Sequence, residues 1–194
     1  NGIEALLKHP EFRNNMEGHP GLFDFAIVGE PTKTNLAIAE KGLLVLDCVA
    51  EGRAGHAARD EGENAIYKAL NDIQWFKTFS FPKVSESLGE IKMSVTSVTT
   101  ENKAHNVVPA ECRFVVDIRV TDQYTHEEIM ETIKQHTSSH CIPRSFRMRS
   151  SKIDPSHPVV KAGISLGKTT YGSPTTSDAA MIDAPVLKCG PGDS

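Results

Sequence analysis

The sequence predicts a protein that combines an α/β unit with an α+β unit, and three observations lead to this fold class. Continuous apolar runs at Phe25–Val28 and Pro185–Cys189 are typical of strands buried on both faces, as in a parallel α/β sheet. Between these runs, the expected elements over residues 43–150 follow the order β-α-β-β-α-β, which is the ferredoxin-like split arrangement. We therefore expect a partial parallel α/β domain (1–40 and 151–194) interrupted by an inserted ferredoxin-like domain (41–150).

The first forty residues contain few regular elements. A short helix is expected over Ile3–Lys8, followed by a polar loop through His19–Gly21. The run Phe25–Val28 is closed by Gly29, and Pro31 prevents a regular continuation of the strand because proline lacks a backbone N–H donor.

The inserted domain is expected to hold two helices and four strands. Apolar residues recur at helical spacing over Glu63–Phe79, and Thr125 suits the N-cap of a helix through Gln135, because Glu127 and Glu128 follow in its first turn. The four strands are expected from apolar runs or from alternation of apolar and polar residues, over 43–50, 91–96, 111–120 and 146–150.

The C-terminal part is expected to return to the α/β pattern. Residues 158–168 have a helical pattern, Ser177 is positioned to cap a short helix from Asp178, and 185–189 forms a last buried strand.

Composition excludes several classes of partner and compartment. The formal net charge of −4 argues against nucleic acid and anionic membranes as partners, because both select basic surfaces. No apolar run approaches the roughly 20 residues that span a bilayer, and the first residues do not form a signal peptide. The four cysteines are widely scattered without a C-x-x-C pair, so we expect buried reduced thiols and a cytoplasmic protein.

Two short segments carry the strongest indications of chemistry. Glu30 follows an apolar run in Val28-Gly29-Glu30-Pro31-Thr32, the position at the end of a strand where open α/β sheets place functional groups. His56 lies in Gly52-Arg53-Ala54-Gly55-His56-Ala57-Ala58, a glycine-flanked loop that leaves the ring accessible. From these residues alone, an exposed loop carboxylate and a surface histidine remain open as alternatives.

Three further segments contain candidate ligand-binding residues. Asn106 precedes the strand that carries Arg119, whose forked donors suit a carboxylate. Thr176 and Ser177 lie in a loop of small residues before an expected helix start, where backbone N–H groups hold anions. A turn asparagine, a surface arginine and a simple N-cap are the alternatives that the residues alone leave open.

Taken together, these segments resemble the M20 metallopeptidase family, in particular acetylornithine deacetylases and succinyl-diaminopimelate desuccinylases. The G-E-P-T and G-x-x-G-H-x-A patterns match in order and spacing. The resemblance implies that Glu30 is a ligand to one of two zinc ions, and that His56 stabilises the oxyanion in the active site of the partner subunit. It also implies that Asn106, Arg119, Thr176 and Ser177 bind the substrate.

The resemblance has consequences for neighbouring acidic residues. Some relatives carry Arg or His where Glu40 lies, so that an acidic side chain there would favour an amino-bearing substrate. Asp117 is expected on the opposite strand face from Arg119, with a structural role.

The activity that the resemblance implies is zinc-dependent hydrolysis of an N-acyl amino acid, with N-acetylornithine in arginine biosynthesis as the leading substrate. A desuccinylase or another M20 aminoacylase or carboxypeptidase is the alternative. The inserted domain is expected to form a homodimer, and a dimerisation module without catalysis is the alternative from a different class of protein.

The resemblance also implies that the chain is a fragment. The upstream His-x-Asp, the bridging Asp and the Glu-Glu pair of the family have no counterpart, and Gly190–Ser194 resembles the approach to a closing zinc histidine that is absent. Of five expected zinc-binding residues only Glu30 is present. We therefore expect this chain alone to hold no zinc stably, because zinc sites use three or four protein ligands, and to be inactive.

Overall fold

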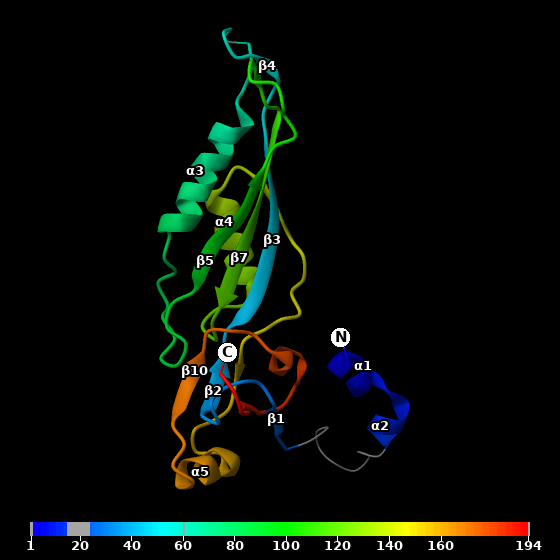
Figure 1. Ribbon diagram of the computed structural model, residues 1–194, viewed down its shortest axis with the longest axis vertical. Coiled ribbons are helices and arrows are strands. Elements are labelled where there is room, and N and C mark those ends of the chain that lie inside the picture. Colours follow the sequence, from blue (N-terminus) through cyan, green and yellow to red (C-terminus); the bar gives the residue numbers. More distant parts are fainter. Residues whose placement is uncertain (1, 15–23, 60, 194) are drawn as a thin grey trace.

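The computed structural model describes residues 2–14, 24–59 and 61–193, and these form two sheets joined end to end (Figure 1). The expected polar loop at 19–21 lies outside the described residues. The first sheet has strand order β1-β11-β2-β10, with β9 paired to β2, and the second has order β5-β7-β3-β8. A separate two-stranded ladder, β4 with β6, lies at the far tip of the second sheet.

The second sheet has the predicted ferredoxin-like topology. Each of its three strand pairs is antiparallel, and α3 and α4 pack on one face (Figure 1). Its core is apolar and fully buried, with Leu44, Leu46, Val116 and Ile118 at 0% exposure. The elements are β3 (Gly42–Glu51), β4 (Gly55–His56), α3 (Ala65–Thr78), β5 (Lys92–Thr99), β6 (Val107–Val108), β7 (Glu111–Val120), α4 (His126–His136) and β8 (His140–Pro143).

The start of α4 confirms the predicted N-cap at Thr125 and adds a reciprocal contact from Glu128 that was not predicted. The Thr125 hydroxyl accepts from the Glu128 N–H at 3.1 Å, and the Glu128 carboxylate accepts from the Thr125 N–H at 2.8 Å. This reciprocal capping box satisfies two of the backbone donors that a helix start leaves unpaired.

The last strand of the inserted domain was predicted in the wrong place. The strand that pairs with β3 is β8, and residues 146–150 are not a strand. The backbone pairing with β3 extends one residue past Pro143, where the Arg144 N–H donates to Val45 O at 2.9 Å. Beyond it the chain makes only scattered backbone contacts, such as Leu43 N–H to Met148 O at 2.8 Å.

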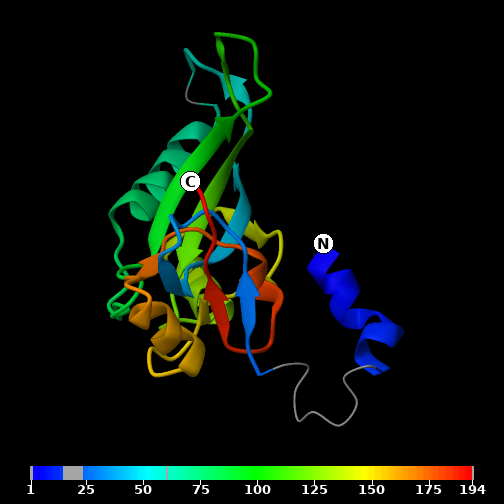
Figure 2. The same ribbon diagram turned by 60° about the horizontal axis from the view of Figure 1, so that its bottom comes forward.

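The first sheet is mixed. The β1–β11 and β2–β10 pairs are parallel, as expected for the α/β unit, whereas β11–β2 and β2–β9 are antiparallel. Figure 2 shows this sheet brought forward, with β1 at its edge. Its elements are β1 (Ala26–Val28), β2 (Leu36–Glu40), β9 (Ser151–Lys152), β10 (Thr170–Ser173) and β11 (Val186–Lys188).

Two expectations for the first sheet need correction. The run that forms β1 was predicted to be buried on both faces, but Ile27 is 56% exposed because β1 is an edge strand. The helix predicted over 158–168 is α5, Pro158–Ser165. It ends early because Gly167 takes a positive φ of 78°, a left-handed conformation that stops an α-helix.

The remaining elements lie at the first sheet's margin. The helices α1 (Gly2–Lys8) and α2 (Pro10–Asn14) precede β1, and a 3₁₀ turn, η1 (Asp178–Met181), precedes β11. Ser177 caps η1 through a hydrogen bond from the Ala179 N–H at 3.2 Å, as predicted.

Candidate functional site

The Glu30 loop packs directly against the loop that follows β11. The N–H groups of Thr32 and Thr34 donate to Gly190 O at 3.2 and 2.9 Å. A side chain at position 190 would lie 2.6 Å from Glu30 O, so only glycine fits this approach. The structure therefore brings the predicted metal ligand beside the segment that we expected to lead to a closing histidine.

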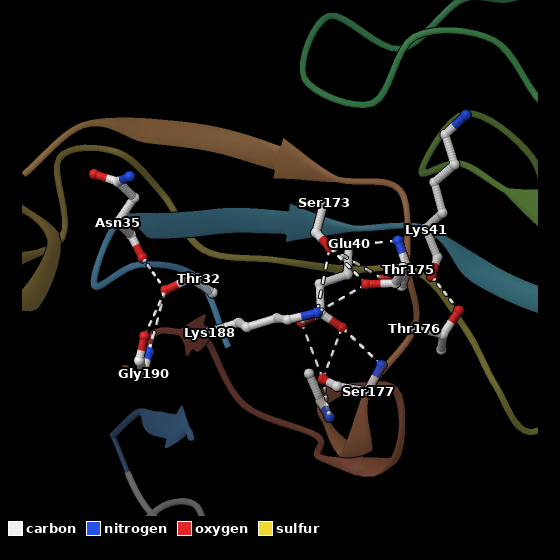
Figure 3. Close-up of polar contacts among 11 residues, drawn as sticks. Thr32, Asn35, Glu40, Lys41, Ser173, Thr175, Thr176, Ser177, Lys188 and Gly190 are labelled. Atoms are coloured by element: carbon white, nitrogen blue, oxygen red, sulfur yellow. Dashed lines mark hydrogen bonds and ion pairs between the residues drawn. The ribbon is translucent and has the colours of Figure 1, made fainter. Parts of the chain in front are cut away.

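A strained turn supports this loop. Lys33 and Thr34 have positive φ values of 53° and 62°, which non-glycine residues adopt rarely. The Thr32 hydroxyl holds the turn by donating to Asn35 O at 2.7 Å, and it accepts from the Gly190 N–H at 3.2 Å (Figure 3). Such strain persists only where surrounding contacts over-determine the backbone.

The residues described here do not by themselves fit a metal ion. Within 2–14, 24–59 and 61–193, no group of three or more His, Cys, Asp or Glu side chains could hold one. Glu30 would be a single carboxylate ligand, and zinc sites in proteins use three or four ligands. No catalytic step through a metal is derived from this chain.

A buried charge pair lies where β2 leaves the first sheet. Glu40 and Lys188 are 2% and 5% exposed, and the Lys188 Nζ lies 3.6 Å from Glu40 Oε1 (Figure 3). The ammonium also donates to the hydroxyls of Thr175 and Ser173 at 3.0 and 3.3 Å. Desolvated charges of this kind are retained only when paired and hydrogen-bonded.

The two predicted substrate-loop residues are tied to this pair. Ser177 donates from its N–H and its hydroxyl to Glu40 Oε2, at 3.0 and 2.8 Å. Thr176 donates its hydroxyl to Lys41 O at 2.6 Å. Glu40 therefore uses its carboxylate within the chain, in contrast to the expectation that it selects an amino-bearing substrate.

Lys188 is the member of this cluster that sequence reasoning missed. A signal was present, since Lys188 ends the apolar run Pro185-Val186-Leu187, which we predicted to be buried. A lysine in such a strand needs a buried carboxylate, and Glu40 supplies it from 148 positions away in the sequence, the difference between 188 and 40.

His56 and Asn106 come together at the tip of the second sheet. His56 pairs with Val107 in the β4–β6 ladder, and the Ala57 N–H donates to Asn106 O at 2.9 Å. Gly52 is required here because a side chain would collide with the Glu63 carbonyl group.

The ring of His56 is exposed and its tautomer is set by a local contact. The Ala58 N–H donates to Nδ1 at 3.2 Å. Because Nδ1 accepts a hydrogen bond, the neutral imidazole carries its proton on Nε2. Nε2 is therefore the hydrogen-bond donor that this exposed ring offers at the tip.

Arg119 lies on the sheet face that α3 and α4 leave uncovered, and its guanidinium is engaged. Its Nε and Nη2 donate to the two carboxylate oxygens of Asp117 at 2.7 and 3.1 Å. The prediction that Asp117 lies on the opposite face was wrong, because residues two apart in a strand share a face.

The structure thus places the predicted residues in separate groups. Thr176 and Ser177 lie together beside Glu40, and Glu30 lies near the end of β1 in the same sheet. His56 and Asn106 lie at the opposite end of the molecule, where β4 is drawn in Figure 1. Within one chain, His56 and Glu30 therefore do not lie close to each other.

The second sheet and its two helices thus form a ferredoxin-like domain inserted into an α/β unit, with an exposed histidine at its tip. The model of the M20 peptidase dimerisation domain matches residues 38–145, and the chain belongs to this family.

Known relatives agree with this assignment. The chain is 30% identical over 166 residues to an acetylornithine deacetylase from Myxococcus xanthus, covering 81% of this chain and 40% of the relative. It is 29% identical over 128 residues to a succinyl-diaminopimelate desuccinylase from Ruegeria sp. (strain TM1040), covering 63% and 32%. The chain thus spans well under half the length of these relatives.

Solved structures share the fold. An M20 family metallo-carboxypeptidase from Sulfolobus solfataricus superposes with a TM-score of 0.68 at 11% identity, over 96% of this chain and 68% of that one. A tripeptidase from Staphylococcus aureus gives a TM-score of 0.65 at 19% identity, over 87% and 49%. In the part of the chain that the structure describes, no helix is long and apolar enough to cross a bilayer.

Proposed function

We propose that this chain is the dimerisation domain and an adjoining part of the catalytic domain of a zinc-dependent amidohydrolase that cleaves an N-acyl amino acid. The domain division is 1–40 and 151–194 for the catalytic part and 41–150 for the dimerisation domain. The family match at 38–145 and the two separate sheets support this division.

The observation that carries the proposal is the position of His56. Its ring is exposed and offers an Nε2–H donor, and β4, which carries it, lies at the opposite end of the molecule from β1, which Glu30 follows (Figure 1). In a homodimer, the tip of one copy reaches the Glu30 region of the other, where the donor stabilises the oxyanion that forms as the amide is attacked. A preorganised donor of this kind contributes several kcal/mol to catalysis.

The other residues have supporting roles in this proposal. Glu30 would supply one ligand to a zinc ion, which would activate water when bound, and the other ligands would be supplied by further residues of the parent enzyme. Asn106 lies beside His56 and contacts the substrate from the tip. Arg119 exchanges Asp117 for the substrate carboxylate, and the loop with Thr176 and Ser177 lines the same site.

N-Acetylornithine is the substrate that we propose first, in arginine biosynthesis and in the cytoplasm. The 30% identity to a deacetylase over 166 residues supports this choice. N-Succinyl-diaminopimelate is the second candidate, because several relatives are desuccinylases. Parallel assays of the parent enzyme on both substrates, with and without a chelator, separate the two.

Subunit complementation tests the role of His56. Variants His56→Ala and Glu30→Ala of the parent enzyme are each expected to be inactive. If His56 acts in the partner's site, half of the dimers in an equimolar re-assembled mixture are mixed and each has one intact site. The mixture should then recover about a quarter of the wild-type activity. No recovery in mixed dimers shown to have formed would refute action across the dimer.

The alternative proposal, a dimerisation module without catalysis, makes a different prediction. The 194-residue chain would be a dimer in light scattering, and the parent polypeptide would show no chelator-sensitive hydrolysis on any N-acyl amino acid.

A further inference from the structure

Two buried cysteines face each other across neighbouring strands of the second sheet. Cys48 in β3 is the direct partner of Cys141 in β8, and the two residues are 1% and 9% exposed. Because directly opposite residues project to the same face, both thiols lie on the buried side of the sheet.

The backbone hydrogen bonds define the geometry of this pair. On the β8 side of β3, the Arg144 N–H donates to Val45 O at 2.9 Å, and these two residues are directly opposite in the register that pairs Leu46 with Pro143. Since hydrogen-bonded and non-hydrogen-bonded positions alternate along an antiparallel ladder, Cys48 and Cys141 form a non-hydrogen-bonded pair.

Such a pair is within reach of a covalent link. The Cα atoms of opposite residues at a non-hydrogen-bonded position are about 4.5 Å apart. Disulfides accept Cα separations from about 4.4 Å upward, so the bond can form without moving either strand.

The chemical environment distinguishes the two thiols. Cys48 donates a hydrogen bond to the Cys141 sulfur, which lowers the pKa of Cys141, while the same contact and burial raise the pKa of Cys48. Cys141 is also the more accessible of the two, and it lies on the edge strand. The thiolate is the reacting form of cysteine, so Cys141 is the group that an oxidant meets first.

We propose that Cys48 and Cys141 form a reversible disulfide site that responds to hydrogen peroxide. The Cys141 thiolate attacks one peroxide oxygen and becomes a sulfenic acid, with release of one water after proton uptake. The Cys48 sulfur then attacks the sulfenic sulfur and loses its proton, and the hydroxyl group leaves as a second water. Overall two thiols and one peroxide give one disulfide and two waters.

The link has a defined structural effect. Among the strands that the structure describes, β8 pairs with β3 alone, from Leu46–Pro143 to Val49–His140. A bond from Cys48 to Cys141 fastens this edge strand, and the end of α4 that precedes it, to the centre of the dimerisation domain. Register slippage of an edge strand is then no longer possible.

Cysteine mapping on the intact 194-residue chain tests the site. The native chain is exposed to hydrogen peroxide, remaining thiols are blocked, and digestion is followed by mass spectrometry. We expect one intrachain link between the peptides of Cys48 and Cys141, an intact mass lower by two hydrogen atoms, and full reversal by dithiothreitol. Circular dichroism measured before and after treatment establishes that the link forms in the folded chain.

Matched variants make the result decisive. Cys48→Ser and Cys141→Ser should each abolish the link. Cys112→Ser should leave it unchanged, because Cys112 is equally buried but is opposite Ala50. The proposal is overturned if the folded wild-type chain gives no Cys48–Cys141 peptide, if Cys141 is instead over-oxidised while Cys48 stays free, or if a link involving Cys112 or Cys189 dominates.

Discussion

The buried pair Glu40–Lys188 should be the most sensitive point of the first sheet. We consider Lys188→Met, which keeps the length of the side chain and removes its charge. The ion pair side chains are only 3% and 6% exposed, so water cannot solvate the carboxylate that is left behind.

The expected loss of stability depends on which interactions the Glu40 carboxylate keeps in this variant. Ser177 still donates its N–H and hydroxyl to Glu40, but the cation 3.6 Å away is gone. Breaking a buried pair by removing one partner costs about 3–5 kcal/mol, because an uncompensated charge remains. The double variant Glu40→Gln with Lys188→Met removes both charges and should recover part of this loss.

Urea unfolding of the 194-residue chain measures these free energies. The matched control is Arg144→Met, which breaks the exposed pair with Asp47, whose side chains are 55% and 52% exposed. Exposed pairs contribute about 0–1 kcal/mol. If Lys188→Met loses no more stability than the control, or the double variant is no better than the single one, the buried charges are not coupled as described.

Three further changes test other parts of the fold. Asp72→Asn should lower the free energy of unfolding by about 1–3 kcal/mol in urea titrations. The two carboxylate oxygens of buried Asp72 accept from the N–H groups of Ser138 and Ser139 at 3.1 and 2.8 Å. In the variant, the amide NH₂ group replaces one of these acceptors with a donor. Gly52→Ala should destabilise the tip and broaden the amide NMR signals of residues 52–63, because its Cβ would collide with the Glu63 carbonyl. Burial lowers the pKa of His126 below its usual value near 6.5, so its contribution to stability is complete above that value and is lost as the pH falls through the lowered pKa. His126→Asn should therefore flatten the fall in unfolding free energy that begins as the pH drops below about 7.

Each of these predictions has a control. Asp47→Asn removes an exposed carboxylate, and a similar loss from Asp47→Asn and Asp72→Asn would contradict the role given to burial. Gly2→Ala meets no atom within 4 Å, and its spectrum should not change. For His126, an unchanged pH dependence in the variant would show that other groups, such as the nearby Glu127 and Arg149, dominate it.

Local signals in the sequence were read successfully. The N-caps at Thr125 and Ser177 depend on contacts within three residues, so they can be recognised without knowledge of the fold. The β-α-β-β-α-β order also depends on local periodicity, and the sheet order β5-β7-β3-β8 then follows from the known topology.

The failures came from contacts distant in the sequence. Residues 146–150 alternate apolar and basic side chains as a strand would, yet pairing with β3 selected 140–143. The strand Leu36–Glu40 was missed because its partners, β10 and β11, are more than 120 residues away. Glu40, the last residue of this strand, could not be recognised as buried without knowledge of its partner Lys188.

The way the two sheets are joined has a mechanical consequence. Only Lys41 separates β2 from β3, so one nearly continuous strand runs from the base of the molecule toward the tip (Figure 1). The ten residues of β3 span about 33 Å. With Lys41 as the pivot and His56 beyond the far end, a rotation of about 10° swings the histidine through about 6 Å. The extended strand therefore works as a lever arm, and two hydrogen bonds hold Lys41 at its pivot. The Lys41 N–H donates to Ser173 O at 3.0 Å, and the Thr176 hydroxyl donates to Lys41 O at 2.6 Å.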